Sequence, residues 1–211
     1  MYVPATPAQP AVALAPVGIV SAAPPTLARP VRTGLGVHGA QLNVLEGHPS
    51  TITGTLRPGL PGKVVMLQRL ANQGWRTITR TLTGVRGRFR LRYLPRQTGS
   101  EPVRLRFAGD ATDLASRRFL GRLNVYRLAG ASWYGGGGQT ACGGSLSSST
   151  LGVANKTLPC GTLVTLRYGG HTLRVPVIDR GPYVEGREFD LTEATKQALG
   201  FGDTGQVWST N

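Results

Sequence analysis

The sequence predicts an all-β protein in two folded parts, and three observations support that fold class. From residue 33 to residue 127, apolar and polar residues alternate in short runs separated by turn residues, which is the pattern of antiparallel strands. No long run has helical spacing, and none approaches the roughly 20 consecutive apolar residues of a transmembrane segment. Charge also divides the chain: residues 29–127 hold 18 Lys and Arg against four Asp and Glu, whereas residues 131–211 hold six of each.

Residues 1–32 precede the first strand pattern and are rich in Pro and Ala. Such a composition offers little apolar surface to bury, so we expect a disordered leader. Residues 11–23 are apolar and end in small residues, as the apolar region of a secretory signal does. A signal peptide carries its positive charge before that region, whereas here Arg29 follows it. We therefore interpret residues 1–32 as an extracytoplasmic leader rather than a complete signal peptide.

The first folded part, residues 33–127, contains seven segments with strand alternation. They span residues 42–46, 50–56, 64–69, 76–83, 88–93, 103–107 and 119–126. In residues 88–93 the alternation is strict, which predicts a half-buried strand with one apolar and one cationic face. About seven strands in a part of this size are typical of a β-sandwich.

A set of short motifs occurs in order along the same part. Residues 54–56 are G-T-L, 65–68 are V-x-L-Q, 87–89 are G-x-F and 107–110 are F-x-G-D, with Trp75 between them. This order resembles bacterial immunoglobulin-like modules and implies an immunoglobulin-like β-sandwich that acts as a spacer or adhesive domain. Its arginine-rich faces fit either a solvated side or a surface for anionic wall polymers. Nucleic acid is disfavoured, because the sequence has no helix-turn-helix pattern, zinc-finger spacing or aromatic ladder.

The two cysteines, Cys142 and Cys160, both lie in the second part and are 18 residues apart. Without a CxxC motif or a nearby histidine they make a poor metal site. A disulfide is favoured over two reduced core cysteines. A disulfide would place the protein in an oxidising compartment, so we expect it to be secreted or associated with the cell wall.

Trp133 and Tyr134 stand before four consecutive glycines, residues 135–138. The glycine run lacks the Lys and Ser or Thr of a phosphate-binding loop. We interpret it as a loop that gives access to the aromatic pair. Such a pair either lines a sugar groove or packs in a core.

Two aspartates in the second part are placed next to regular structure. The apolar strand pattern of residues 172–178, which ends a glycine-linked hairpin, leads directly into Asp179. A carboxylate there indicates a function, or a structural role as the partner of Arg180 or of a buried amide. Asp190 precedes a helical stretch, residues 193–199, and fits either a site or a helix N-cap or near-cap residue.

Five longer motifs follow one another through the second part. They are A-S-W-Y-G at 131–135, T-A-C-G-G at 140–144, N-K-T-L-P-C-G-T at 155–162, V-P-V-I-D-R-G-P-Y at 175–183 and E-F-D-L-T at 188–192. Through them residues 131–211 resemble the rare lipoprotein A family, whose members include lytic transglycosylases, and the first domain of expansins. The resemblance implies a six-stranded double-psi β-barrel with a short helix, and a substrate that is peptidoglycan or a related β-1,4 glycan.

The same resemblance implies particular site residues. In lytic members a Glu follows T-A-x-G, a His precedes K-T-L-P, and an Asp stands in D-R-G-P. This sequence keeps Asp179, but it has Gly144 in place of the Glu and Asn155 in place of the His. In expansins two aspartates and a threonine line the sugar groove, and Asp179, Asp190 and Thr140 match them.

We therefore predict that Asp179 and Asp190 are the catalytic residues. The predicted substrate-binding residues are Trp133, Tyr134, Thr140, Asn155, Arg180 and Tyr183. No cofactor or metal is expected, because the histidines are scattered without ligand spacing. They are His38, His48 and His171.

Three functions fit these residues. The first is a lytic transglycosylase, which needs only one acid/base because the 6-hydroxyl of the substrate closes a 1,6-anhydro ring; Asp179 would supply that group. The second is a non-catalytic expansin-like wall-loosening or glycan-binding module, which agrees with the replaced Glu and His. The third is a scaffold for protein partners at the division site.

Overall fold

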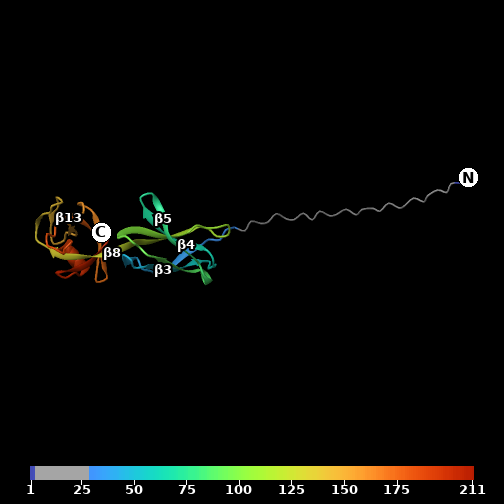
Figure 1. The fold of residues 1–211 in the computed structure, drawn as a ribbon, viewed down its shortest axis with the longest axis horizontal. Coiled ribbons are helices and arrows are strands. Elements are labelled where there is room, and N and C mark those ends of the chain that lie inside the picture. Colours follow the sequence, from blue (N-terminus) through green and yellow to red (C-terminus); the bar gives the residue numbers. More distant parts are fainter. Residues whose placement is uncertain (3–28) are drawn as a thin grey trace.

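The computed structural model describes residues 1–2 and 29–211, and most of this part is β-strand (Figure 1). It contains one short α-helix, and within it no helix has the length and apolar character needed to cross a membrane. The all-β class is therefore confirmed. The leader expected at residues 1–32 lies mostly outside the described residues.

Two sheets make up the first part of the fold. The strands of one sheet are, in spatial order, β1 (Gly34–Ala40), β3 (Ser50–Arg57) and β6 (Arg88–Tyr93). The strands of the other are β5 (Gly74–Leu82), β4 (Val64–Ala71), β7 (Gly99–Phe107) and β8 (Ser116–Tyr134), with β2 (Asn43–Leu45) parallel to β8 and the 3-10 turn η1 (Val85–Gly87) before β6. One core contains buried residues of both sheets, among them Ile52, Leu67, Leu91 and Leu105. We call residues 33–127 the two-sheet part.

Each of the seven expected strand segments overlaps a strand of the structure. The cationic alternation is also confirmed, because Phe89 and Leu91 are buried between exposed arginines on β6. Strand β1 was not expected, since its three glycines have low strand preference. It forms against β3, where a Cβ on Gly36 would lie 3.0 Å from the hydroxyl oxygen of Thr55. The immunoglobulin-like assignment of this part stays a prediction.

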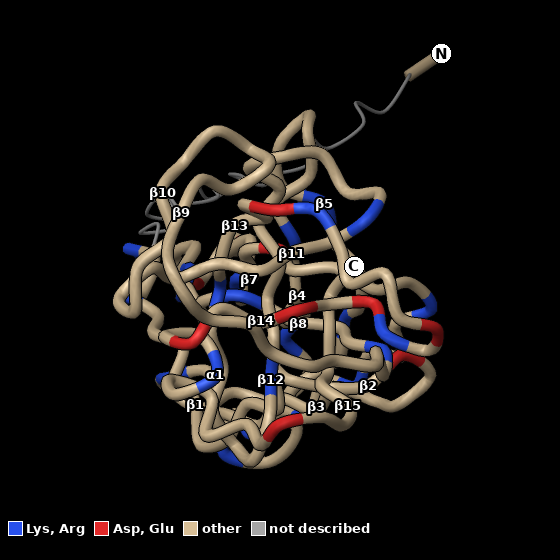
Figure 2. The backbone as a smooth tube through the Cα atoms, turned by 90° about the vertical axis from the view of Figure 1, so that its left-hand side faces the viewer, with Lys and Arg blue, Asp and Glu red and all other residues tan. Residues whose placement is uncertain are grey.

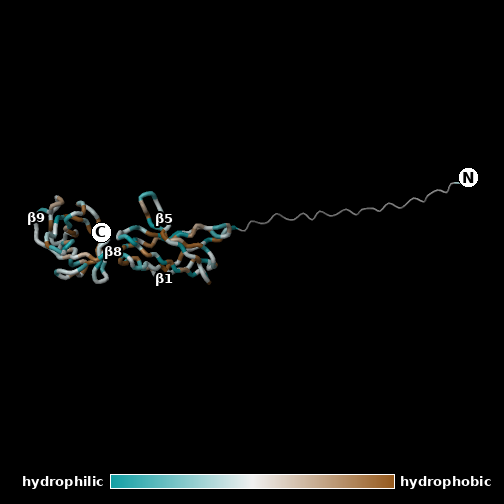
Figure 3. Tube along the Cα trace, viewed as in Figure 1, coloured by the Kyte–Doolittle hydropathy of each residue, from teal (hydrophilic) through white to brown (hydrophobic). Residues whose placement is uncertain are grey.

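The second part is a closed six-stranded barrel. Its strands are, in order around the barrel, β14 (Phe189–Thr192), β11 (Val153–Ala154), β13 (His171–Asp179), β12 (Leu163–Tyr168), β15 (Thr204–Ser209) and the C-terminal half of β8. A parallel pairing of β14 with β8 closes the ring. The short strands β9 (Gly138–Gln139) and β10 (Ser145–Leu146) pair outside it. The barrel has its own core, which includes Val153, Leu166, Val177 and Phe189, so apolar segments occur in both parts (brown in Figure 3).

The helix α1 (Glu193–Leu199) has the bounds that the sequence predicts. Thr192 is its N-cap, since the Thr192 hydroxyl accepts a hydrogen bond from the backbone N–H of Thr195. Gly200 ends the helix in the left-handed conformation, with φ of 65°. Asp190 is therefore not the N-cap itself; it lies two residues earlier, in β14.

Strand β8 runs without a break from the two-sheet part into the barrel (Figure 1). At the junction Tyr126 is fully buried, donates a hydrogen bond to Asn43 and packs 5.7 Å from the ring of Trp208. Arg127 forms an ion pair with Glu188 beside it. A strand shared by two sheets, with a buried aromatic contact and an ion pair, holds the two parts in one orientation.

Candidate functional site

Asp179 is the last residue of β13, and its carboxylate is fixed by backbone donors. The oxygen Oδ1 accepts the N–H of Ala141 and the N–H of Arg180, each at 2.8 Å. The Asp179 carbonyl accepts the N–H of Asn155 at 3.1 Å. Within the described residues no group donates to Oδ2, so one oxygen positions the side chain and the other is available.

Asp190 lies on the strand next but one to β13. Ala154 of β11 is the register partner of Asp179 on one side and of Asp190 on the other. At the usual spacing of strands, the two aspartate Cα atoms are therefore about 10 Å apart. The hydroxyl of Ser132, the register partner of Asp190 on β8, donates a hydrogen bond to Asp190 Oδ1. The barrel thus brings the two predicted catalytic carboxylates to neighbouring positions around β11.

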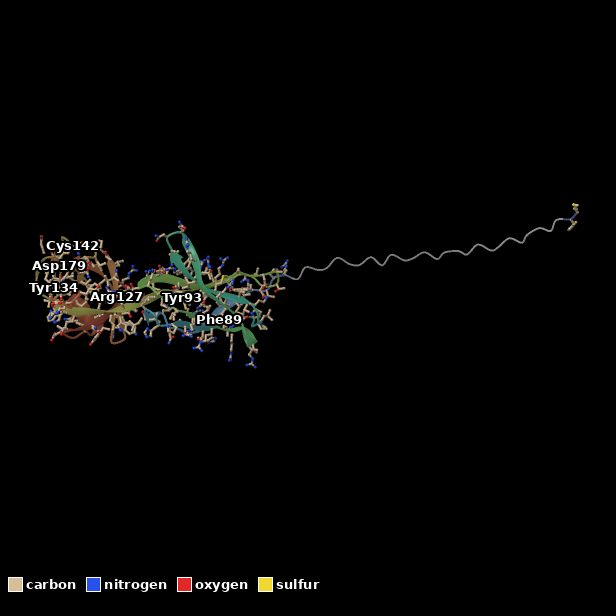
Figure 4. All side chains as sticks on the ribbon, viewed as in Figure 1. Phe89, Tyr93, Arg127, Tyr134, Cys142 and Asp179 are labelled. Atoms are coloured by element: carbon tan, nitrogen blue, oxygen red, sulfur yellow. A yellow bond between two sulfur atoms is a disulfide. The ribbon has the colours of Figure 1, made fainter. Side chains whose placement is uncertain are left out.

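Tyr134 completes this cluster. Its hydroxyl is buried and has no hydrogen-bond partner among the described residues. Burial raises the pKa of Tyr134 above its ordinary value of 10.0, and the charge of Asp179, the interaction of its carboxylate with the Tyr134 hydroxyl and the charge of Asp190 raise it further. Figure 4 shows Tyr134 and Asp179 at the same end of the molecule, near Cys142. A neutral phenol with an unused donor therefore lies beside two carboxylates.

A tight turn at residues 140–144 supplies the Ala141 N–H that binds Asp179. The Thr140 hydroxyl accepts the N–H of Gly144 and donates to its carbonyl, both at 3.2 Å, and the Thr140 N–H donates to the same carbonyl at 2.7 Å. Cys142 in this turn forms a disulfide with Cys160, with Cα atoms 5.7 Å apart. The predicted disulfide is confirmed, and Thr140 and the disulfide together hold the turn that positions Asp179.

Asn155 and Arg180 are bound to backbone groups of the following turn. The Asn155 side-chain oxygen accepts the N–H groups of Thr157 and Leu158, and its NH2 group donates to the carbonyl of Glu188. The Arg180 guanidinium donates to the carbonyls of Asn155 and Leu158. The alternative that Arg180 neutralises Asp179 is therefore wrong, because only its backbone N–H contacts the carboxylate. Substrate binding by Asn155 and Arg180 stays a prediction.

The structure separates Trp133 from the carboxylates. Successive side chains of a strand point to opposite faces, so Trp133 and Tyr134 diverge on β8. The Trp133 ring NH donates to Asp203 at 2.9 Å, and the ammonium of Lys196 lies 3.8 Å from the ring centroid. These two donors lower the pKa of Asp203, Lys196 more than Trp133. Tyr183, by contrast, is 81% exposed and free to contact a ligand.

Sequence reasoning missed two contributors to the site, Ser132 and the Ala141 N–H. Ser132 was within reach of prediction, since residues two apart on a strand share a face and Ser132 is two residues before Tyr134. The Ala141 N–H was not, because a backbone donor has no sequence signature. Contact between them and the aspartates depends on segments 38 and 58 residues apart in the chain.

Comparisons with known proteins agree with this geometry. Residues 128–208 match the family model described as lytic transglycolase, a double-psi β-barrel. The probable endolytic peptidoglycan transglycosylase RlpA of Aquifex aeolicus is 43% identical over 75 residues, which cover 33% of this chain and 33% of that protein. The endolytic peptidoglycan transglycosylase RlpA of Pseudomonas aeruginosa strain PAO1 is 38% identical over 87 residues, which cover 38% of this chain and 25% of that protein.

Among solved structures, the Streptomyces papain inhibitor aligns with a TM-score of 0.34 and 21% identity, over 40% of this chain and 92% of that one. The fold is a double-psi β-barrel, and residues 128–208 of it match the lytic transglycolase family model. More narrowly, residues 128–208 form an RlpA-like domain. The match spans a third or less of the length of these two relatives.

Proposed function

We propose that this chain is an extracytoplasmic protein whose barrel cleaves glycan strands of peptidoglycan as a lytic transglycosylase, with Asp179 as the acid/base. The observation that carries the proposal is the cluster of Asp179, Asp190 and the unpartnered Tyr134 hydroxyl on an RlpA-like barrel. The disulfide agrees with an oxidising compartment.

The chemistry requires one group that gives and takes a proton. Asp179 in its protonated form donates to the glycosidic oxygen, and the bond from that oxygen to C1 of the sugar breaks. The 6-hydroxyl of the same sugar then bonds to C1, which closes a 1,6-anhydro ring, and its proton returns to Asp179. No water is consumed. A general acid of this kind contributes about 10²–10⁴-fold to the rate.

Asp190 and Tyr134 have supporting roles in this scheme. The transition state of glycoside cleavage carries positive charge at C1, and the negative charge of Asp190 stabilises it. The Tyr134 hydroxyl is buried beside Asp179, so it acts through the Asp179 carboxylate and not by contact with the substrate. Exposed Tyr183 offers an apolar ring to a sugar face.

Gly144 and Asn155, which replace the Glu and His of lytic relatives, differ in whether the original side chain could be restored. A Cβ on Gly144 would meet only the Thr140 hydroxyl, at an ordinary 3.7 Å, so a Cβ is accommodated there. Asn155 is 3% exposed and accepts two backbone N–H groups, which an imidazole cannot reproduce. Gly144→Glu is therefore the informative restoration, and we expect it to increase the rate of cleavage.

A second candidate function is a non-catalytic expansin-like or glycan-binding module. Gly144 has no side chain to contribute, and Asn155 is committed to the turn at residues 155–158. On this proposal Asp179, Asp190 and Thr140 bind sugar hydroxyls without bond cleavage.

The test is incubation of the protein with peptidoglycan sacculi, followed by mass spectrometry of soluble 1,6-anhydromuropeptides. We expect products that Asp179→Asn abolishes, that Gly144→Glu increases, and that the matched control Asp110→Asn, in the two-sheet part, leaves unchanged. Products that persist in Asp179→Asn would contradict the assignment of the acid. Retention on sacculi without products would favour the second candidate. If neither products nor retention on sacculi is found, the similarity to RlpA proteins extends to the fold alone.

A further inference from the structure

The outer face of the β5-β4-β7-β8 sheet carries a row of cations. Across the four strands the register pairs Arg80 with Met66, Met66 with Arg106, and Arg106 with Arg117. The three arginines are exposed. At the usual strand spacing the row is about 14–15 Å long. Arg104, on the same face of β7, lies beside it, and we call these four arginines the arginine face.

The positive charge of the arginine face is not balanced within the protein. Arg106 and Arg117 are directly opposed, and like charges in that position destabilise a sheet. No ion pair joins the face to a carboxylate anywhere in residues 29–211. The pKa of Arg104 is lowered by its burial and then by the charges of Arg106 and Arg117. The basic residues of the chain, blue in Figure 2, outnumber the acidic ones, shown in red. The fold retains repulsion that a bound anion would relieve.

A hollow and an aromatic edge adjoin the arginines. Arg104, Arg106 and Arg117 line a surface hollow of about 440 Å³, together with Ser116. Phe119, the register partner of Arg104, is 61% exposed. Its ring meets that of Trp75 edge-on, with centroids 5.6 Å apart, and the Arg104 guanidinium lies 4.2 Å from the Trp75 ring centroid. The site therefore offers several cations, a hydroxyl and one exposed apolar ring.

These features select among anionic ligands. A planar guanidinium binds phosphate through two parallel hydrogen bonds, and a row across four strands is long enough for several groups of a linear polymer. Single-stranded nucleic acid is typically bound by open aromatic rings on which successive bases stack. Here Arg104 covers a face of Trp75 and only Phe119 is exposed. A polymer of phosphates joined by sugars or polyols, without bases, fits this chemistry best.

We propose that the arginine face binds a linear phosphodiester polymer of the cell envelope. The choice of an envelope polymer rests on the proposed function, whereas the anion site rests on the geometry of the sheet. Phosphates bind Arg106, Arg117 and Arg80, and Phe119 contacts the uncharged links between them. Because β8 connects this sheet directly to the barrel, binding would place the barrel beside the wall polymer network.

The experiment measures binding of the full chain to poly(glycerol phosphate) by isothermal titration calorimetry. The test variant is Arg80→Gln/Arg106→Gln/Arg117→Gln. The matched control is Arg88→Gln/Arg90→Gln/Arg92→Gln, which removes the same charge from exposed positions on β6, in the opposite sheet. We expect the test variant to bind at least about tenfold more weakly and with a smaller salt dependence, and the control to bind as the unmodified chain does.

Several results would overturn the proposal. They are absence of binding, equal weakening in both triple variants, tighter binding of oligo(dT) or of phosphatidylglycerol vesicles, and full competition by millimolar inorganic phosphate. Asp179→Asn separates this proposal from the proposed function, because it should lose cleavage of sacculi and keep polymer binding. The arginine test variant should lose polymer binding and still cleave soluble glycan strands.

Discussion

Asp110 and Asp113 in the two-sheet part each lie 2.6 Å from the ammonium of Lys63, whereas Asp179 and Asp190 in the barrel have no ion-pair partner among the described residues. Lys63, with help from Thr112, holds the pKa of Asp110 well below its ordinary range. In the barrel the neighbours are backbone N–H groups, a serine and a tyrosine. The first pair shares one lysine and serves the loop, whereas the second has no counter-ion and leaves carboxylate oxygen available for a ligand.

The two acidic pairs are also positioned by different means. An ion pair with one lysine fastens residues 110–113 to the edge of β4. The barrel pair depends on strand register around Ala154 and on the turn at residues 140–144, which the disulfide ties to Cys160. The barrel pair is therefore positioned by backbone and covalent support and not by a counter-ion.

The largest expected effect is the loss of activity on substitution of Asp179, which the matching substitution of Asp113 should not cause. Asp179→Asn should lower the release of anhydromuropeptides by about 10²–10⁴-fold, and should change stability little, because the amide oxygen still accepts both N–H groups. Asp113→Asn should leave product release intact and lower the Tm, since the side chain is 3% exposed and binds Lys63. Product assays and thermal unfolding measure both. The comparison fails if Asp113→Asn loses products without loss of stability.

The disulfide provides the next effect. Replacing Cys142 and Cys160 by alanine should lower the free energy of unfolding by about 3 kcal/mol in the chain-entropy model. It should also reduce product release, because the turn that donates the Ala141 N–H to Asp179 is no longer tied down. Urea unfolding followed by circular dichroism checks the first expectation. An unchanged midpoint would show that hydrogen bonds alone hold the turn.

Tyr134→Phe tests whether the Tyr134 hydroxyl serves activity or stability. Removal of a buried hydroxyl without a partner should leave the free energy of unfolding unchanged or raise it by up to about 1 kcal/mol. Product release should fall by about tenfold, because the hydroxyl acts through the Asp179 carboxylate beside it. The measurements are denaturant unfolding and the sacculus assay. Clear destabilisation would instead reveal a structural partner for the hydroxyl.

The smallest effect is the pH dependence of the Lys63 cluster. The pKa of Asp110 is lowered on folding, so its contribution to stability is present above the ordinary value of 3.8 and is lost as the pH falls below it. The pKa of Lys63 is raised, so its contribution is lost only as the pH rises above 10.5. Unfolding from pH 2 to pH 6 should show a slope that Lys63→Met reduces. An identical slope in the variant would assign the acid sensitivity to other groups.

Much of the fold could be predicted because local patterns and motifs determine it. The alternation in residues 88–93 predicted β6, and the helix bounds at Glu193–Leu199 follow from its capping residues. Strand β1 escaped prediction, because three glycines give no local strand signal and only pairing with β3 forms it. For the candidate site, residue types and motifs singled out Asp179, Asp190 and Tyr134. They did not show that Asn155 and Arg180 would bind backbone groups instead.

The sequence by itself determined the β class, the separation of charge between the two parts, the disulfide and the RlpA-like motifs, since each depends on residue type and order along the chain. Only the tertiary structure decided that Arg180 faces carbonyls instead of Asp179, that Lys196 covers Trp133, and that Ala154 lies between the two aspartates. It also decided that three arginines from three strands form one unpaired row. The physical reason is register: strand pairing sets which side chains meet across long sequence separations, and no local pattern specifies it.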